Sequence, residues 1–234
     1  MWRIGFRFRR AYKNGSGLNH GAQSYCRCSL AQPRLDASTR LDREQLRLPV
    51  DGEQPITEPG RRRVYSNTGI ERAAQLLEQR AEMPFTDYLA GAVARPLALR
   101  GRLLGSPAHG WHGPLDDLLA LGRELLAPTL VAAETLAEAT MVQFPGLVGV
   151  LPGLGRMEPN DWGLTFELRD AKSPHWTGSR NSARTFGHFG ASGTFLWVDP
   201  EVRLACGVLT GRPFGDWAKA AWPALSDAVL AEAG

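Results

Sequence analysis

The 234-residue sequence predicts a mixed α and β domain of the α+β class, organised around one antiparallel β-hairpin. Residues 186–210 hold two apolar runs separated by Asp199-Pro200-Glu201, which predicts two paired strands joined by a tight turn. Residues 68–141 repeat apolar positions at helical spacing, and a last helical pattern covers about 216–231. With 43% hydrophobic residues, the chain is long enough to bury a substantial core.

Four helices are expected ahead of the hairpin. The first follows Thr68, whose hydroxyl can cap it, and its apolar residues recur at i, i+3, i+4 and i+7. Further helices are expected at about 85–94, after Pro114, and at about 132–140. Partial alternation then predicts a strand at 162–168, followed by a loop up to the hairpin. The final helix at 216–231 would pack on the sheet.

The segments between these elements predict no metal and no cofactor. His109 and His112 form an H-x-x-H pair in a Gly/Pro-rich loop, but a metal site needs at least a third ligand. Residues 145–160 are rich in Gly and Pro, yet they lack the third glycine of a dinucleotide fingerprint and the Gly-Lys-Ser/Thr ending of a phosphate loop. We therefore interpret residues 145–160 as a rim over a cleft.

Charge is distributed unevenly along the chain. Residues 1–50 hold 10 Lys/Arg against 3 Asp/Glu, whereas residues 51–234 hold 17 against 21. The basic residues of the first segment are spread out, so a solvated tail is expected and no nucleic-acid partner is expected. No apolar run reaches the ~18 residues of a membrane span, and the basic start lacks the apolar stretch of a signal peptide, which predicts a cytoplasmic protein.

The three cysteines imply no disulfide framework. Cys26 and Cys28 lie in the tail and are too few for a structural zinc site. Cys206 falls in an apolar strand run, which predicts a buried thiol. Residues 1–47 follow no sustained period, so we expect an irregular basic segment there and a separate domain over residues 48–234.

Two motifs resemble those of the serine β-lactamase and penicillin-binding-protein superfamily. Tyr65-Ser66-Asn67 is similar to the Tyr-x-Asn motif of its class C β-lactamase, DD-peptidase and esterase branch, and His188-Phe189-Gly190 is similar to its Lys/His-x-Gly strand. The order and the flanking text agree as well, with GRRRVYSNTGI ahead of a helix and WVDPE after the strand. The resemblance covers roughly residues 48–232, and it implies a partial domain of the β-lactamase/DD-peptidase-like fold.

The resemblance also implies a reaction and a set of roles. The family performs acyl transfer, in which a serine attacks a β-lactam, peptide or ester carbonyl of a small-molecule acyl substrate. Tyr65 would transfer protons, and His188 would be the cation that tunes Tyr65 or meets a substrate carboxylate. Asn67 would position the substrate, Gly190 would let the strand approach it, and the Ala191 N–H would hold the oxyanion. Taken singly, the non-catalytic interpretation is favoured for each: Tyr65 as a core ring, Asn67 as a turn residue and His188 as an edge histidine. Taken together with the flanking matches, the residues favour the inherited site.

The nucleophile motif of the family is absent from the sequence. No serine is followed three residues later by lysine, and the lysines are Lys13, Lys172 and Lys219. Ser192 lacks the full Gly-x-Ser-x-Gly context of a nucleophile elbow, and Ser66 occupies the variable position of its motif. We therefore expect the chain to represent the C-terminal half or so of the fold, joined to an N-terminal segment unlike the family.

Three functional hypotheses follow. The first is a β-lactamase-related serine hydrolase, esterase-like or peptidase-like because His replaces Lys in the strand motif, with impaired activity. The second is a non-catalytic remnant or pseudoenzyme that binds ligand only, and the third is a protein that binds polyanions through its basic tail. If the N-terminal strands of the fold are missing, the strand at 204–209 should expose an edge, which is an aggregation liability.

Overall fold

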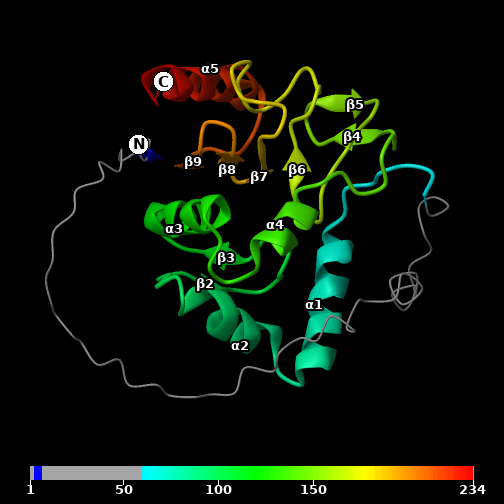
Figure 1. Ribbon diagram of the computed structural model, residues 1–234, viewed down its shortest axis with the longest axis vertical. Helices are drawn as coiled ribbons and strands as arrows, with labels where there is room; N and C mark the ends of the chain where they lie inside the picture. Colours follow the sequence, from blue (N-terminus) through cyan, green and yellow to red (C-terminus); the bar gives the residue numbers. More distant parts are fainter. Residues whose placement is uncertain (1–2, 7–59, 234) are drawn as a thin grey trace, which may run out of the picture. The chain divides into compact units, whose positions relative to one another are not determined.

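The computed structural model describes residues 3–6 and 60–233. Its main element is a five-stranded antiparallel sheet in the order β1-β9-β8-β7-β6 (Figure 1). The strands are β1 (Arg3–Phe6), β6 (Glu167–Leu168), β7 (Phe186–Gly190), β8 (Thr194–Asp199) and β9 (Leu204–Leu209). Two short pairs lie outside this sheet: β2 (Arg102–Leu103) with β3 (Trp111–His112), and β4 (Gly149–Leu151) with β5 (Gly155–Met157).

The helices agree with the apolar spacing of the sequence. They are α1 (Asn67–Ala81), α2 (Phe85–Leu89) continuing into the π-helical turn η3 (Ala90–Ala94), α3 (Leu115–Leu126), α4 (Ala133–Ala139) and α5 (Asp216–Ala233). The start of α1 differs from the prediction, because Ser66 rather than Thr68 has the extended N-cap backbone and its side chain makes no capping bond. Asn67 is therefore the first residue of the helix and not part of the preceding loop.

Helices cover both faces of the sheet (Figure 1). On one face, α5 contributes to a core of buried residues that includes Trp197 of β8 and Trp222 of α5. On the other face, α3 packs against β8 and β9, and Gly122 of α3 leaves room there for Leu196 and Ala205. Successive residues of β8 thus point into different cores, which explains why the sequence of this strand is a continuous apolar run. The mixed fold predicted from the sequence is confirmed.

The predicted two-stranded hairpin consists of three strands. The predicted leading strand is interrupted at residues 191–193, where the chain turns back from β7 to β8. Gly193 has a φ of +83°, and a Cβ there would collide with the Arg212 carbonyl, so the chain needs glycine to turn at this point. The prediction included this glycine in the leading strand of the hairpin.

The expectation of an exposed edge at residues 204–209 is wrong. Arg3–Phe6 form β1, which pairs with β9 from Arg3↔Leu209 to Phe6↔Cys206. A short edge strand is held by backbone hydrogen bonds, which leave no periodic pattern in the sequence. The structure does not describe the rest of residues 1–47, which include Lys13, Cys26 and Cys28. The predicted boundary at residue 48 also lies outside the described residues.

Smaller expectations can also be compared with the structure. Cys206 is fully buried, as predicted, and its burial raises the pKa of the thiol to about 12. The loop expected around His109 and His112 contains the β2–β3 pair, in which His112 faces Arg102. None of the helices in residues 60–233 is long and apolar enough to cross a membrane.

Candidate functional site

Three rings from separate parts of the chain meet beside the sheet. Tyr65 lies just before α1, Trp162 lies five residues before β6, and His188 is the middle residue of β7. The ring centroids of Tyr65 and His188 are 5.7 Å apart, those of Trp162 and His188 are 5.6 Å apart, and those of Tyr65 and Trp162 are 6.2 Å apart. The fold therefore brings together the tyrosine and the histidine of the two sequence motifs.

The same three rings line two cavities. The larger has a volume of about 360 Å³, and Ser66, Val150 and Asn160 are among its other lining residues. The smaller has a volume of about 140 Å³ and a mainly aromatic and aliphatic wall: Leu151, Pro152, Phe189 and Phe214, with Gly153, Glu167 and Ala191. The cluster of Tyr65, Trp162 and His188 thus forms a wall common to an open cavity and a small apolar one.

Backbone contacts fix the approach to Tyr65. The Arg63 N–H donates to the Val148 carbonyl at 2.8 Å, and the Arg63 guanidinium donates from Nη2 to the Gln143 carbonyl at 2.6 Å. These bonds tie the segment before α1 to residues 143–148, which lead into the β4–β5 hairpin. Tyr65 itself is 46% exposed, so its hydroxyl-bearing ring is accessible to a ligand.

His188 differs from the cation that the motif predicted. Burial lowers the pKa of its imidazole, although a hydrogen bond to the Phe189 carbonyl and the charge of Glu167 act in the opposite direction. At neutral pH the ring is therefore mainly uncharged. Its Nδ1 lies 2.7 Å from the Phe189 carbonyl and donates to it, which leaves Nε2 as a hydrogen-bond acceptor.

The other predicted site residues occupy less central positions. Ala191 lies in the β7–β8 turn and lines the smaller cavity. Asn67 is exposed in the first turn of α1, and it is not among the described residues that line the two cavities. A Cβ on Gly190 would lie 3.1 Å from Thr194 Oγ1 and 3.3 Å from Ser192 Oγ. A side chain at position 190 would thus first meet the side chains of Ser192 and Thr194 around the hairpin turn.

The two serines considered as nucleophiles are placed differently. Ser66 lines the larger cavity next to Tyr65. Ser192 lies in the exposed turn, where its hydroxyl is 3.2 Å from that of Thr194. Of the two, Ser66 is the one that a ligand in the larger cavity would contact.

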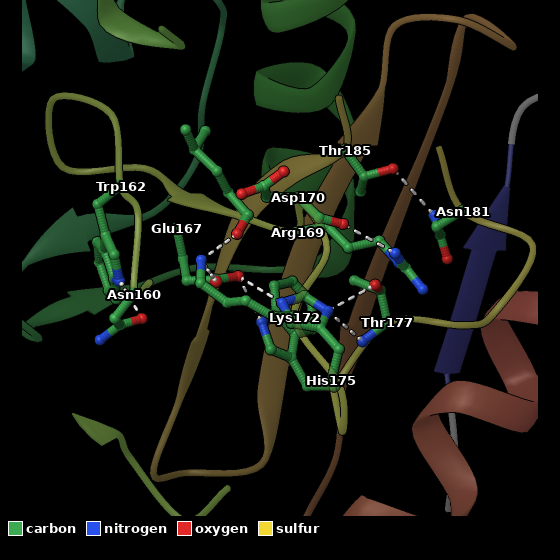
Figure 2. A network of polar contacts seen from close by, with 12 residues as sticks. Asn160, Trp162, Glu167, Arg169, Asp170, Lys172, His175, Thr177, Asn181 and Thr185 are labelled. Atoms are coloured by element: carbon green, nitrogen blue, oxygen red, sulfur yellow. Dashed lines mark hydrogen bonds and ion pairs between the residues drawn. The ribbon is translucent and has the colours of Figure 1, made fainter. Parts of the chain in front are cut away.

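A buried polar network surrounds Glu167 (Figure 2), which lines the small cavity. The Glu167 carboxylate, 1% exposed, accepts from Lys172 Nζ at 2.7 Å, from His175 Nε2 at 2.8 Å and from Trp176 Nε1 at 2.9 Å. Lys172 also donates to the carbonyls of Asp161 and Leu168. Every polar atom of this network therefore has a partner, which makes it a rigid support.

The network keeps Glu167 ionised. Burial alone would raise the pKa of this carboxyl, but the hydrogen bond from His175 and the ammonium of Lys172 outweigh it and lower the pKa below its ordinary value. His175 is oriented by Thr177, whose N–H donates to Nδ1 at 3.2 Å, so Nε2 carries the proton given to Glu167. Because Glu167 lines the small cavity together with His188, its charge acts directly on the site.

Sequence reasoning missed Trp162, Glu167 and Phe214 as site residues. Trp162 and Glu167 stood at the two ends of a predicted strand, where a side chain pointing into a cavity gives no distinct pattern. The signal available for Glu167 was the cluster of Glu167, Lys172 and His175 within nine residues. No group of three or more potential metal ligands occurs in the part of the chain that the structure describes.

A family model described as "Beta-lactamase" matches residues 16–230. The match begins ahead of Leu48, where the motifs predicted that the resemblance starts. A comparison with the curated proteins gave no match.

Solved structures with a similar fold come from several sources. A β-lactamase from Mycobacterium bovis is 54% identical with a TM-score of 0.74, and the match covers 76% of this chain and 67% of that one. A hydrolase with promiscuous acyltransferase activity is 21% identical (TM-score 0.55, covering 74% and 57%). A penicillin-binding protein homologue from Caulobacter crescentus is 15% identical (TM-score 0.55, covering 70% and 57%). This chain thus spans between about half and two thirds of their lengths.

Proposed function

Because the chain belongs to the β-lactamase family, we propose that it is a β-lactamase-related serine hydrolase, acting by acyl transfer on ester, amide or β-lactam carbonyls. The observation that carries the proposal is the meeting of Tyr65 and His188, far apart in the sequence, at the wall of two cavities. The 54% identity with a protein described as a β-lactamase supports the same reaction class.

Each group in the site has a proposed role. Tyr65 transfers protons to and from the reacting oxygen, and the uncharged His188 accepts a hydrogen bond at Nε2. The Ala191 N–H stabilises the oxyanion, Asn67 positions the substrate from the start of α1, and Gly190 keeps the end of β7 free of a side chain. A substrate carboxylate would find no charge on His188 at neutral pH. We therefore propose that small neutral esters are turned over in preference to carboxylate-bearing substrates.

The small cavity suits the uncharged aryl group of such an ester. Its volume of about 140 Å³ is close to the ~150 Å³ of an apolar protein cavity that binds benzene. Its walls are mostly aromatic and aliphatic, so an uncharged group of about the size of a phenyl ring would fill it.

Turnover is proposed to be impaired, because none of the 234 residues forms the Ser-x-x-Lys pair. A second candidate function is non-catalytic: the site binds an acyl ligand without hydrolysing it. The observation that favours this alternative is the same missing pair, since a tyrosine and an uncharged histidine alone supply no activated nucleophile.

Hydrolysis of p-nitrophenyl acetate by the full chain tests the proposal. We expect slow but sustained turnover, reduced about 10²-fold or more by Tyr65→Phe, which removes the proton-transferring hydroxyl. Tyr88→Phe is the matched control, since Tyr88 of α2 is not among the residues lining either cavity. Ser66→Ala and Ser192→Ala then show whether either serine carries the acyl group.

Two other results would change the conclusion. Turnover that is equal in Tyr65→Phe and Tyr88→Phe would contradict the proposed site. Absence of turnover, together with saturable binding of the neutral analogue N-phenylacetamide that Tyr65→Phe or Trp162→Leu weakens, would establish the non-catalytic alternative.

A further inference from the structure

A third cavity lies apart from the Tyr65 site. It has a volume of about 460 Å³ and is bounded by residues 172–179, by the turn of the β4–β5 hairpin and by the first part of α5. Gly153 is the one residue that it shares with the small apolar cavity. The network of Glu167 lies between the two, because Glu167 lines the apolar cavity while Lys172 and His175 line this one.

The lining of this cavity is basic. Three cationic side chains contribute to it, from Arg169, Lys172 and Lys219. The same lining includes the hydroxyl residues Ser173 and Ser179, and none of the described residues that form it is acidic. Such a lining favours an anion to the extent that its cations lack carboxylate partners, because the walls exclude part of the water.

The three cations are not equally available. Lys172 is committed to Glu167 and to two backbone carbonyls. The Arg169 guanidinium donates from Nε to the Gly178 carbonyl and from Nη1 to the Asp170 carbonyl, both uncharged acceptors. Within the part of the chain that the structure describes, no carboxylate lies within 4.0 Å of that guanidinium. Its charge is therefore not neutralised by a direct partner.

Lys219 can bind the same ligand as Arg169 with little loss of stability. Its ammonium is 2.9 Å from Asp216, three residues earlier on α5, and the Asp216 side chain is 97% exposed. Exposed pairs of this spacing contribute little to stability, so a ligand can replace Asp216 as the partner of Lys219. The acid that opposes an anion here is Asp227, which accepts from Ser179 Oγ at 2.9 Å without lining the cavity.

We propose that this cavity is a binding site for a small oxyanion, carried by a phosphate or a carboxylate group. The guanidinium donors of Arg169 that are not bonded to the Gly178 and Asp170 carbonyls can donate to oxygens of such a group, and Lys219, which lines the same cavity, would add a second positive charge. The ligand would bind independently of acyl transfer, because its contacts involve no residue of the Tyr65 site.

Calorimetric titration of the full chain with inorganic phosphate tests the site, with succinate as the carboxylate probe and with ionic strength held constant. We expect saturable binding of at least one probe, weakened about tenfold or more by Arg169→Gln and by Lys219→Glu. Arg100→Gln is the matched control, because it removes a surface cation paired with an exposed carboxylate elsewhere. Tyr65→Phe should leave the affinity unchanged.

The variants also distinguish anion binding at this site from non-specific electrostatic attraction to a basic chain. Circular dichroism shows whether Arg169→Gln is folded, and Lys219→Glu decides the matter if it is not, since Lys219 is exposed. Binding of only phosphate or only succinate identifies the headgroup. The proposal is overturned if neither probe binds saturably, or if folded Lys219→Glu binds as tightly as Arg100→Gln.

Discussion

The ring cluster of Tyr65, Trp162 and His188 and the buried network of Glu167, Lys172 and His175 are neighbours with opposite character. The cluster is open, since Tyr65 is 46% exposed and its members meet through ring faces and edges. The network is closed, with side chains at most 2% exposed and each charge bound to a partner. The ring cluster has exposed surface for a ligand, whereas the network borders two cavities with its polar atoms already paired.

This difference indicates a division of labour. Removing one partner from a buried charge network leaves an uncompensated charge, so such a change should destabilise the fold around β6 and β7 strongly. The ring cluster already has an exposed member in Tyr65, so its surface can serve binding and chemistry. The two regions are connected by Glu167, which lines the small cavity and whose charge acts on His188. Four predictions test this division, beginning with the largest effect.

Glu167→Gln should destabilise the fold by about 3–5 kcal/mol, because it leaves the buried ammonium of Lys172 without its counter-charge. Urea unfolding measures the change. The matched control is Glu158→Gln, which breaks an ion pair with Arg156 whose side chains are 64% and 67% exposed, and it should cost less than about 1 kcal/mol. Equal effects of the two variants would show that the network is no more important than a surface pair.

At low pH the wild type should lose its greater stability against unfolding relative to Glu167→Gln. The pKa of Glu167 in the folded chain lies below its ordinary value of 4.5, so its ionisation stabilises the fold fully above that pH. As the pH falls below 4.5 and through the folded pKa, the stability difference should shrink. Urea unfolding of both proteins from pH 7 to pH 3 measures it, and a difference that grows on acidification would contradict the assignment.

His188 should titrate below its ordinary value of 6.5, and Glu167→Gln should lower its pKa further, because the carboxylate now favours the charged ring. NMR titration of the imidazole signals measures both. Since the unfolded chain binds the proton more readily, the folded state should also lose some stability as the pH falls through 6.5. A rise of the His188 pKa in Glu167→Gln, with no such change in Glu201→Gln on the surface, would contradict the coupling.

Tyr65→Phe should have the smallest effect on stability, within about 0.5 kcal/mol, since the ring is exposed and retains its contacts with Trp162 and His188. Thermal unfolding is the measurement. A loss of several kcal/mol would place Tyr65 in the structural framework rather than in the open region, and it would weaken the comparison between the two regions.

The sequence predicted the helices well because each buries one face. The spacing of Ile70, Ala73, Ala74 and Leu77 anticipated α1, and the apolar residues after Pro114 anticipated α3. It was less successful where backbone geometry decides the structure, as at Gly193, whose left-handed conformation splits one predicted strand into β7 and β8. The pairing of β1 with β9 was missed for a similar reason, since ladder hydrogen bonds are independent of side-chain type.

The candidate site divides in the same way. The motifs identified Tyr65 and His188, and the fold places them against each other. They did not identify Trp162, Glu167 or Phe214, which reach the cavities from segments without a motif. They also predicted a charged His188, whereas the charge state depends on how deeply the sheet and its neighbours bury the ring.

The sequence by itself determined the α+β class, the helical segments, the two motifs and the absence of Ser-x-x-Lys, because these follow from residue type and spacing along one stretch of chain. Only the tertiary structure decided the partner of β9, the protonation of His188, the closed network of Glu167 and the basic cavity beside it. Burial, desolvation and charge pairing depend on which distant segments come into contact, and a local sequence pattern does not show those contacts.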